Sequence, residues 1–302
     1  MSLRDSRIEY QRRMFRVVEY IDAHLADALD LSTLAAVAHF SPFHFHRLFR
    51  AWSGGETLGD YLRRRRIEKA AQRLVVQPRL SVLEAALGAG FGSGEAFARA
   101  FRQHFGMAPS AWRMQQRKNG QALSKIGQAN RDAPAEHGFS QTTENPMNVT
   151  LIDRPATRVA FLRHTGPYGE PVGRFYAEQV YPWMVKHGLL GRVRYGIAHD
   201  DPLVTAPEQC RYDACVELAA DEPVSSTMLT TTLPAGRYAS LPFKGTSAQI
   251  DGVWQRLVRE WLPDSGLQLG DGPCFEHYPI DACYDEASGV FECRLCVPVQ
   301  PL

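Results

Sequence analysis

The sequence predicts an α+β protein of two domains: an all-α domain of two tandem helix-turn-helix units, then a duplicated β-α-β-β domain with one antiparallel sheet. The length of 302 residues suits two domains of about 100–200 residues each. Helical periodicity dominates residues 8–117, whereas short β-branched and aromatic runs alternate with two amphipathic stretches over 148–302. Between them, residues 118–147 are rich in Gly, Gln, Asn, Ser and Thr without an apolar period, which indicates a linker.

The net charge of +1 conceals a division of charge along the chain. Residues 1–118 hold 19 Lys and Arg against 11 Asp and Glu, a net charge of +8. Residues 148–302 hold 13 against 19, a net charge of −6, and the segment between them holds 2 against 3. The basic half suits a polyanionic partner, and the acidic half suits a neutral or cationic one.

The front half repeats a short helix, a turn and a second helix. The predicted pairs of helices are Leu31–Ala38 with Phe43–Trp52, and Val82–Leu87 with Gly94–Phe105. Residues recur 52 positions apart: Ser41, Phe45, Arg47, Phe49, Arg50 and Gly54 match Ser93, Phe97, Arg99, Phe101, Arg102 and Gly106. A connecting helix over Glu56–Val76 would span about 30 Å, close to the ~34 Å between successive major-groove faces. One chain would thus present two recognition helices to one face of a duplex.

Helical spacing predicts which side chains of the second helices face outward. Aromatic residues of both helices fall on one face, which leaves a set of polar residues on the other: His44, His46, Arg47, Arg50, Arg99 and Arg102. Arginines placed in this way can bond guanine edges and phosphates in the major groove.

Three alternatives stay open in this half. Phe43 is either a contact to bases or an ordinary core residue, and His44 and His46 are either contacts or surface residues without a role. The run Arg63–Arg66 covers a full helical turn, so it is either a solvated face or a source of one or two phosphate contacts.

Two strings carry a resemblance to the AraC/XylS-type DNA-binding domain, over about residues 8–115. They are LAAVAHFSPFHFHRLFR at 34–50 and GFGSGEAFARAFRQHFGMAP at 90–109. The resemblance implies that Phe43, His46 and Arg47 face bases in the first groove and Arg99 in the second. Gly94 and Glu95 stand where members of that family often carry polar readers. Glu95 can accept from a cytosine amine but repels phosphate.

The back half repeats at an offset of 79 residues, since RPATRVA at 154–160 matches LPAGRYA at 233–239. Each repeat is predicted to be a strand, an amphipathic helix and two further strands: Thr157–Arg163, Phe175–Lys186, Arg194–Ala198 and Arg211–Leu218, then Arg237–Phe243, Ile250–Trp261, Phe275–Ile280 and Phe291–Val299. We expect one sheet with both helices on one face and an open groove on the other. A groove on a pseudo-twofold is a natural ligand site.

The repeats differ where the groove is expected. Gly196 and Ala198 align with Glu276 and Tyr278, and alternation puts each pair on one face of its strand. One wall would be small, and the other would hold a carboxylate beside a phenol. A carboxylate at a partly apolar cavity favours a cationic ligand, which offsets its desolvation. The alternative is a glutamate on an ordinary solvated strand face.

Residues 148–300 resemble the GyrI-like effector-binding domain, through RHTGPY at 163–168, HDDP at 199–202, RYDACV at 211–216 and DGPCFE at 271–276. The resemblance implies that Glu276 contacts cationic amphiphilic ligands. Cys296 stands where relatives often carry an aromatic residue that could line the pocket. Some GyrI-like proteins resemble hydrolases of reactive cyclopropane-bearing compounds that use a glutamate and a tyrosine in this groove. In this chain, Glu276 with Tyr278 or Tyr168 would act as the acid and base. The two halves together match the layout of the Rob-type regulators.

The leading interpretation is a cytoplasmic transcriptional regulator that binds double-stranded DNA and a small cationic effector, with RNA polymerase as a candidate further partner. Its effector-binding candidates are Glu276, Tyr278, Tyr168 and Gly196. The alternatives are a hydrolase and a sequestering or DNA-gyrase-interacting module. We expect no catalytic residue and no cofactor. We also expect no metal, because Cys293 and Cys296 lie three apart on a strand and point to opposite faces. We also expect no membrane span, no secretion signal and reduced cysteines.

Overall fold

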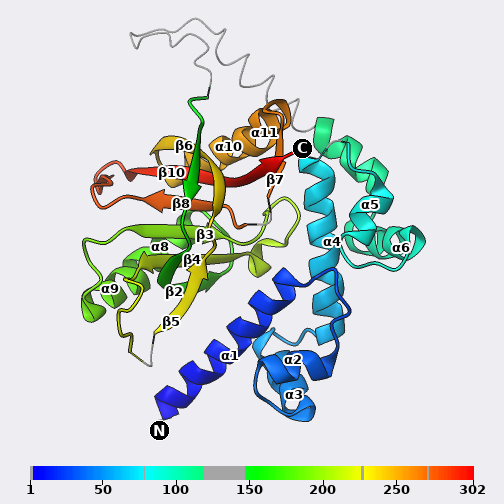
Figure 1. Ribbon diagram of the computed structural model, residues 1–302, viewed down its shortest axis with the longest axis horizontal. Coiled ribbons are helices and arrows are strands. Elements are labelled where there is room, and N and C mark those ends of the chain that lie inside the picture. Colours follow the sequence, from blue (N-terminus) through cyan, green and yellow to red (C-terminus); the bar gives the residue numbers. More distant parts are fainter. Residues whose placement is uncertain (1–2, 78, 119–146, 226–227, 271) are drawn as a thin grey trace, which may run out of the picture. The chain divides into compact units, whose positions relative to one another are not determined.

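A computed structural model describes residues 3–77, 79–118, 147–225, 228–270 and 272–302 of the protein (Figure 1). These residues fall into two compact units, and each is considered by itself. Nearly all of the predicted linker, residues 119–146, lies outside the described residues. Among the helices of the described ranges, none combines the length and the apolar character that a membrane crossing requires.

The N-terminal unit is all helical, as predicted. Its helices are α1 (Leu3–Ala23), α2 (Leu31–Val37), α3 (Pro42–Trp52), α4 (Leu58–Val76), α5 (Val82–Leu87) and α6 (Gly94–Phe105), and residues 109–118 are also helical. The helices α2 to α6 each begin after a residue whose side chain accepts a hydrogen bond from the backbone N–H three positions on: Asp30, Ser41, Thr57, Ser81 and Ser93. These caps satisfy N–H groups that a helix leaves unpaired, and so they fix where each helix starts.

Both helix-turn-helix units are packed by the aromatic residues that the repeat predicts. Phe45 and Phe49 of α3 are at most 1% exposed, and so are Phe97 and Phe101 of α6. Each turn also contains one residue with positive φ, His39 at 53° in the first unit and Gly90 at 84° in the second. A Cβ at Gly90 would lie 2.5 Å from the Leu25 carbonyl oxygen, so only glycine fits this turn.

The C-terminal unit is a curled antiparallel sheet, with strand order β1-β6-β10-β8-β3-β4-β2-β5 and the short strands β7 and β9 paired to β10. The strands are β1 (Thr150–Arg154), β2 (Thr157–Thr165), β3 (Arg194–Ala198), β4 (Arg211–Glu217), β5 (Leu229–Leu233), β6 (Gly236–Gly245), β7 (Leu267–Leu269), β8 (Phe275–Tyr278), β9 (Tyr284–Asp285) and β10 (Val290–Pro301).

The repeat unit contains one strand more than predicted. β1 and β5 precede the predicted first strands, so each repeat is β-β-α-β-β. These two strands are exchanged: β1 of the first repeat pairs with β6 of the second, and β5 pairs with β2. Both lie at the ends of the strand order, and three of the five residues of β1 and two of those of β5 are exposed or nearly so. Each has only five residues, and the middle three of β5 are all threonine, so the apolar pattern is too short to reveal either strand.

Each repeat carries one long helical segment with a π-helical turn in its middle. The first runs through α8 (Glu170–Phe175), the turn Tyr176–Val180 and α9 (Tyr181–His187), and the second through α10 (Ser247–Arg256), the turn Leu257–Trp261 and α11 (Leu262–Asp264). A proline follows each turn, Pro182 and Pro263. Because proline lacks an N–H and crowds the preceding turn, the wider π turn accommodates it.

Candidate functional site

The recognition helix α3 presents its predicted outward residues to solvent. Phe43 is 69% exposed, so the interpretation of Phe43 as a core residue is wrong. His46, Arg47 and Arg50 are also exposed, and the Arg47 guanidinium lies 5.9 Å from the centre of the Phe43 ring. His44 differs, because its Nδ1 lies 3.2 Å from the capping hydroxyl at the start of the helix. The exposed face of α3 is thus aromatic and basic, which suits bases and phosphates.

The recognition helix α6 places Glu95, Arg99 and Arg102 on its exposed surface. These residues are four and three positions apart, so they follow one face of the helix. The acidic residue lies in the first turn of α6, which is the end that reads base edges in helix-turn-helix proteins. The second recognition face is therefore less basic than the first.

The arginine run on α4 is mostly engaged within the protein. Arg64 pairs with Glu56 and Glu68, and Arg65 pairs with Glu68 and with Asp22 of α1. The next residue, Arg66, donates to the backbone carbonyls of residues 25 and 27. These three arginines therefore do not form a freely solvated face. Arg63 is exposed, so it is the strongest candidate for the predicted phosphate contact.

In the C-terminal unit, β3 and β8 are paired at the centre of the sheet, and the register puts Gly196 directly opposite Glu276. These residues are equivalent in the two repeats. The pairs on either side, Tyr195 with His277 and Ile197 with Phe275, exchange under the repeat relation. The pseudo-twofold axis therefore passes between Gly196 and Glu276.

Glu276 is 9% exposed and lies at the centre of a cluster of hydroxyl groups. Its Oε2 accepts hydrogen bonds from Tyr212 at 2.8 Å and from Tyr278 at 2.7 Å. The Tyr212 hydroxyl lies 3.4 Å from that of Tyr176. Burial raises the pKa of Glu276, although hydrogen bonds from Tyr278, Tyr212 and Trp254 act in the opposite direction. The alternative of a glutamate on a solvated strand face is wrong.

The missing side chain at Gly196 makes this arrangement possible. A Cβ there would overlap the Tyr212 hydroxyl and lie 2.6 Å from Glu276 Oε2. A contact of that length forces its neighbours to move, so any other residue would separate the phenol from the carboxyl group. The prediction that Gly196 forms one wall of a groove is therefore wrong, because the Tyr212 hydroxyl and the Glu276 carboxyl group occupy the space above it.

The predicted groove face is corrected by the structure. We expected Glu276 to face away from the helices, yet it receives a hydrogen bond from Trp254 of α10, and Leu295, its neighbour on β10, packs in the core cluster with residues of α10. The opposite face is filled: Tyr195 and Phe275 are buried there, and the Arg154 guanidinium lies 5.2 and 5.3 Å from their rings. The curl of the sheet brings these groups together, which a strand pattern does not convey.

Tyr168 takes a different place from the one predicted. Its hydroxyl donates to the carbonyls of Asp200 and Arg211 rather than to Glu276. Its ring packs edge-on against Tyr212 with the centres 6.2 Å apart, so Tyr168 reaches the carboxyl cluster only through that neighbour.

The polar motifs of this half form a structural network beside it. Arg163 donates two hydrogen bonds of 2.6 Å to Asp213, which also pairs with His199. The Arg163 and His199 charges hold the pKa of Asp213 below its usual range despite its burial. Arg211 donates to both oxygens of Asp200. These ion pairs join β2 and β4 to the residues that follow β3, and they take no part in the cluster at Glu276.

Three residues of the cluster were missed from the sequence: Tyr176, Tyr212 and Trp254. For Tyr212 a signal existed, since Ala198 pairs with Tyr212 and alternation places both on the Gly196 face. Tyr176 and Trp254 lie on the two helical segments, and their approach depends on how the helices pack on the sheet.

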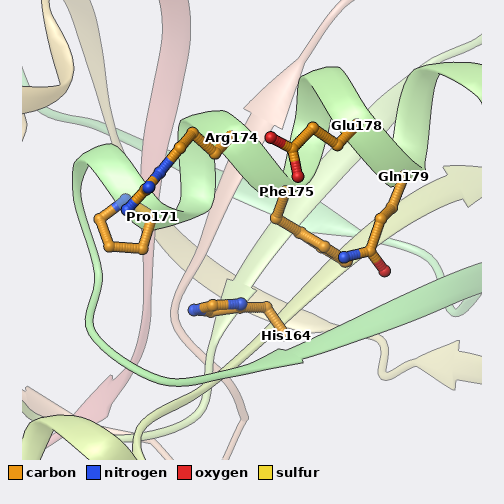
Figure 2. A pocket seen from close by; sticks show the side chains of 6 residues that line it. All are labelled: His164, Pro171, Arg174, Phe175, Glu178 and Gln179. Atoms are coloured by element: carbon orange, nitrogen blue, oxygen red, sulfur yellow. The ribbon is translucent and has the colours of Figure 1, made fainter.

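A separate hollow of about 230 Å³ lies between β2 and the first helical segment (Figure 2). Figure 2 shows the His164 ring below the helix that bears Arg174, Glu178 and Gln179. Arg174 already pairs weakly with Glu170 at 3.8 Å, and the hollow contains none of the predicted effector residues. Within the described ranges, no group of His, Cys, Asp or Glu is arranged to hold a metal ion.

Two capped helix-turn-helix units, joined to a duplicated sheet domain with a buried carboxyl group on its axis, define a protein with one nucleic-acid-binding half and one small-molecule-binding half. Residues 147–300 match the family described as the GyrI-like small molecule binding domain, and residues 34–115 match a helix-turn-helix domain. The chain belongs to the GyrI-like family and carries an AraC-type DNA-binding domain before it.

The chain is similar to proteins that match it along most of its length and to others that match one part of it. The right origin-binding protein of Escherichia coli K12 is 26% identical over 297 residues, which cover 93% of this chain and 96% of that protein. The DNA gyrase inhibitor of Serratia proteamaculans is 33% identical over 153 residues, 48% of this chain and 94% of that protein. The crystal structure of the AdpA DNA-binding domain in complex with a target DNA is 33% identical and covers 35% of this chain and 94% of that one, with a TM-score of 0.33.

The two family matches confirm the fold class, with a helix-turn-helix region followed by a GyrI-like domain. The chain is an AraC-family DNA-binding transcriptional regulator with a GyrI-like small-molecule-binding domain.

Proposed function

We propose that this regulator binds a cationic, partly aromatic small molecule at Glu276, and that this binding changes its affinity for a specific DNA site. The observation that carries the proposal is the buried carboxyl group on the pseudo-twofold. Within the described residues Glu276 has hydrogen bonds to neutral groups but no ion pair. A buried carboxylate without a countercharge gains most from a cationic ligand, because the ligand supplies the charge that burial has removed from water.

The surroundings of Glu276 support the aromatic character of this ligand. Tyr176, Tyr278 and Trp254 are each partly exposed, so their rings border the carboxyl group without sealing it. Aromatic rings attract cations through their faces and stack with other rings. A ligand that combines a positive charge with aromatic groups uses both the carboxylate and the rings.

For the DNA-binding half, we propose that Phe43, His46 and Arg47 face bases and that Arg50 contacts the backbone. The exposure of all four on α3 supports these roles. On α6, Arg99 and Arg102 are proposed as contacts and Glu95 as a modest reader of cytosine, in line with their exposure on one face. RNA polymerase is the further partner that a transcriptional regulator of this layout would meet.

Calorimetry with tetraphenylphosphonium tests the effector site, because this ion keeps its charge at every pH and carries four phenyl rings. Glu276→Gln keeps the shape of the side chain and removes its charge, so it should weaken binding by ~2–5 kcal/mol, as expected for a desolvated charge partner. Glu217→Gln is the matched control: Glu217 also lies on a strand and accepts a tyrosine hydroxyl, from Tyr195, on the other face of the sheet. Glu217→Gln should weaken phosphonium binding by less than ~1 kcal/mol.

The same titration has a defined pH dependence. The raised pKa of Glu276 means that the group takes up a proton at a higher pH than an ordinary glutamate. Affinity for the permanent cation should therefore be full above that pKa and fall as the pH is lowered through it. The nearby phenols of Tyr176, Tyr212 and Tyr278 have raised pKa values and stay neutral throughout. Equal affinity of the wild type and Glu276→Gln at neutral pH would refute the site.

A second function would use the same groups. A carboxyl group with a raised pKa, bonded to two phenols, also has the features of a general acid or base. Chemical analysis of an added reactive ligand after incubation separates the two: an effector is recovered intact, whereas a hydrolase consumes it. The effect of the ligand on DNA affinity, measured on a site selected from a random pool, separates a sensor from a sequestering module.

A further inference from the structure

A positive charge already lies in the proposed effector site. Arg194 of β3 pairs in register with Tyr278 of β8, so both side chains lie on the same face of the sheet as Glu276. The Arg194 guanidinium lies 5.3 Å from the centre of the Tyr278 ring. That ring is the one whose hydroxyl donates to Glu276 Oε2.

The positive charge of Arg194 acts on the phenols of the cluster, and no carboxylate of the described residues pairs with it. Burial raises the pKa of Tyr176, a second phenol of the site, and the charge of Arg194 opposes that rise. Arg194 is partly buried, and the described residues provide it with no carboxylate partner at ion-pair distance. Its contact with the Tyr278 ring is thus a cation–π interaction in a half-buried place, where such contacts are stronger than at an exposed surface.

Two acidic residues lie in the same region as Arg194. Glu276 lies at the centre of the face, and the Asp251 carboxylate on α10 is close enough to raise the pKa of Glu276. Two carboxyl groups and one guanidinium therefore share this region. A cationic ligand would bind to the same Tyr278 ring and near the same two carboxyl groups as Arg194 does.

This inference rests on the proposed function. We propose that Arg194 is a specificity-determining residue of the effector site, a resident cation that a ligand must displace from the face of Tyr278 to bind beside Glu276. Small cations without aromatic groups gain too little to displace it. Cations with several aromatic rings gain stacking in addition to charge, and so they are selected.

Arg194 has no equivalent arginine in the second repeat. The position equivalent to Arg194 in the second repeat is Cys274, which has no charge. The site therefore has a single guanidinium on β3 and a single glutamate on β8, on opposite sides of the axis.

Calorimetry on the full chain tests the proposal with tetraphenylphosphonium and, as a neutral analogue, triphenylphosphine oxide. Arg194→Gln removes the resident cation and should tighten binding of the phosphonium by about 2- to 30-fold, the range that corresponds to one cation–π contact. Binding of the neutral analogue should tighten less, because it gains the freed ring face but not the removal of a like charge. Arg194→Lys keeps a cation at the same place and should stay within about 3-fold of the wild type. Arg194→Met keeps the apolar stem and carries the same expectation as Arg194→Gln, and thermal unfolding checks the fold of each variant.

The contrary result is equally defined. If Arg194 only holds Tyr278 in position, Arg194→Gln and Arg194→Met will weaken the binding of both ligands, and the inference is overturned. Unchanged phosphonium affinity in both variants overturns it as well. In either case, the proposed function still holds if Glu276→Gln binds the phosphonium more weakly than the wild type does. Failure of the wild type and of every variant to bind the phosphonium would overturn both proposals together.

Discussion

Gly196 is the residue on which the geometry of the carboxyl cluster depends most directly. A Cβ at this position would occupy the place of the Tyr212 hydroxyl, and Glu276 Oε2 would be 2.6 Å away. The conformation of Gly196 is ordinary for a strand, so glycine is required here for space alone. The pair Gly196 and Glu276 therefore works as one unit: the absence of one side chain lets the other be bonded by two phenols.

We predict that Gly196→Ala displaces the Tyr212 phenol and disrupts the bonding of Glu276. Overpacking of a filled site costs about 1–3 kcal/mol, so the thermal midpoint should fall and phosphonium affinity should fall with it. Gly173→Ala in α8 is the control, because a Cβ there meets nothing within 4 Å. It should be neutral or stabilising by up to about 1 kcal/mol. A Gly196→Ala protein as stable as the wild type would show that the cluster has more room than its contacts indicate.

At this scale the sequence contained half of the site. The internal repeat identified Gly196 and Glu276 as a broken symmetry, and alternation added Tyr278. It could not add Trp254 or Tyr176, because no local pattern records which helical side chain reaches which strand. Tyr168 was misjudged for the same reason: its hydroxyl satisfies two backbone carbonyls, a demand that exists only in the folded loop.

At the scale of elements, the helices of the second helix-turn-helix unit lie where the sequence predicts them. The predicted bounds of α5 and α6 are those observed, because a serine cap marks each start and a glycine follows each end. The strands β1 and β5 were missed, since each has only five residues and its pairing partner belongs to the other repeat. Local signals thus sufficed where hydrogen bonds are local, and they failed where pairing joins distant segments.

The two recognition helices give the prediction that belongs at this scale. Arg47→Ala should cost about 1–3 kcal/mol on a selected DNA site and relax base preference at its position. Arg99→Ala should cost less, because the exposed Glu95 on the same face of α6 opposes phosphate. Binding titrations against matched and mutated sites measure both effects. Wild-type affinity and preference in both variants would exclude these helices from the grooves.

For the whole molecule, the division of charge has a measurable consequence. The first 118 residues carry a net charge of +8, so the logarithm of DNA affinity should fall steeply and linearly with the logarithm of salt concentration. Arg63→Gln should reduce this slope by about 1 if Arg63 meets a phosphate. Arg65→Gln should instead lower stability and leave the slope unchanged, because Arg65 is engaged by Asp22 and Glu68. A slope near zero for the wild type would contradict binding through phosphates.

The exchange of β1 and β5 between the repeats bears on how such a site can exist at all. A single repeat, made as a separate chain, would complete its sheet only by lending its first strand to a second copy, which is the arrangement of a swapped homodimer. On the axis of that dimer every residue faces its own copy. Two glutamates would repel each other, and two glycines would leave the axis without charge. Fusion of the two copies into one chain is what allows a lone carboxylate to occupy the centre with an empty place opposite it.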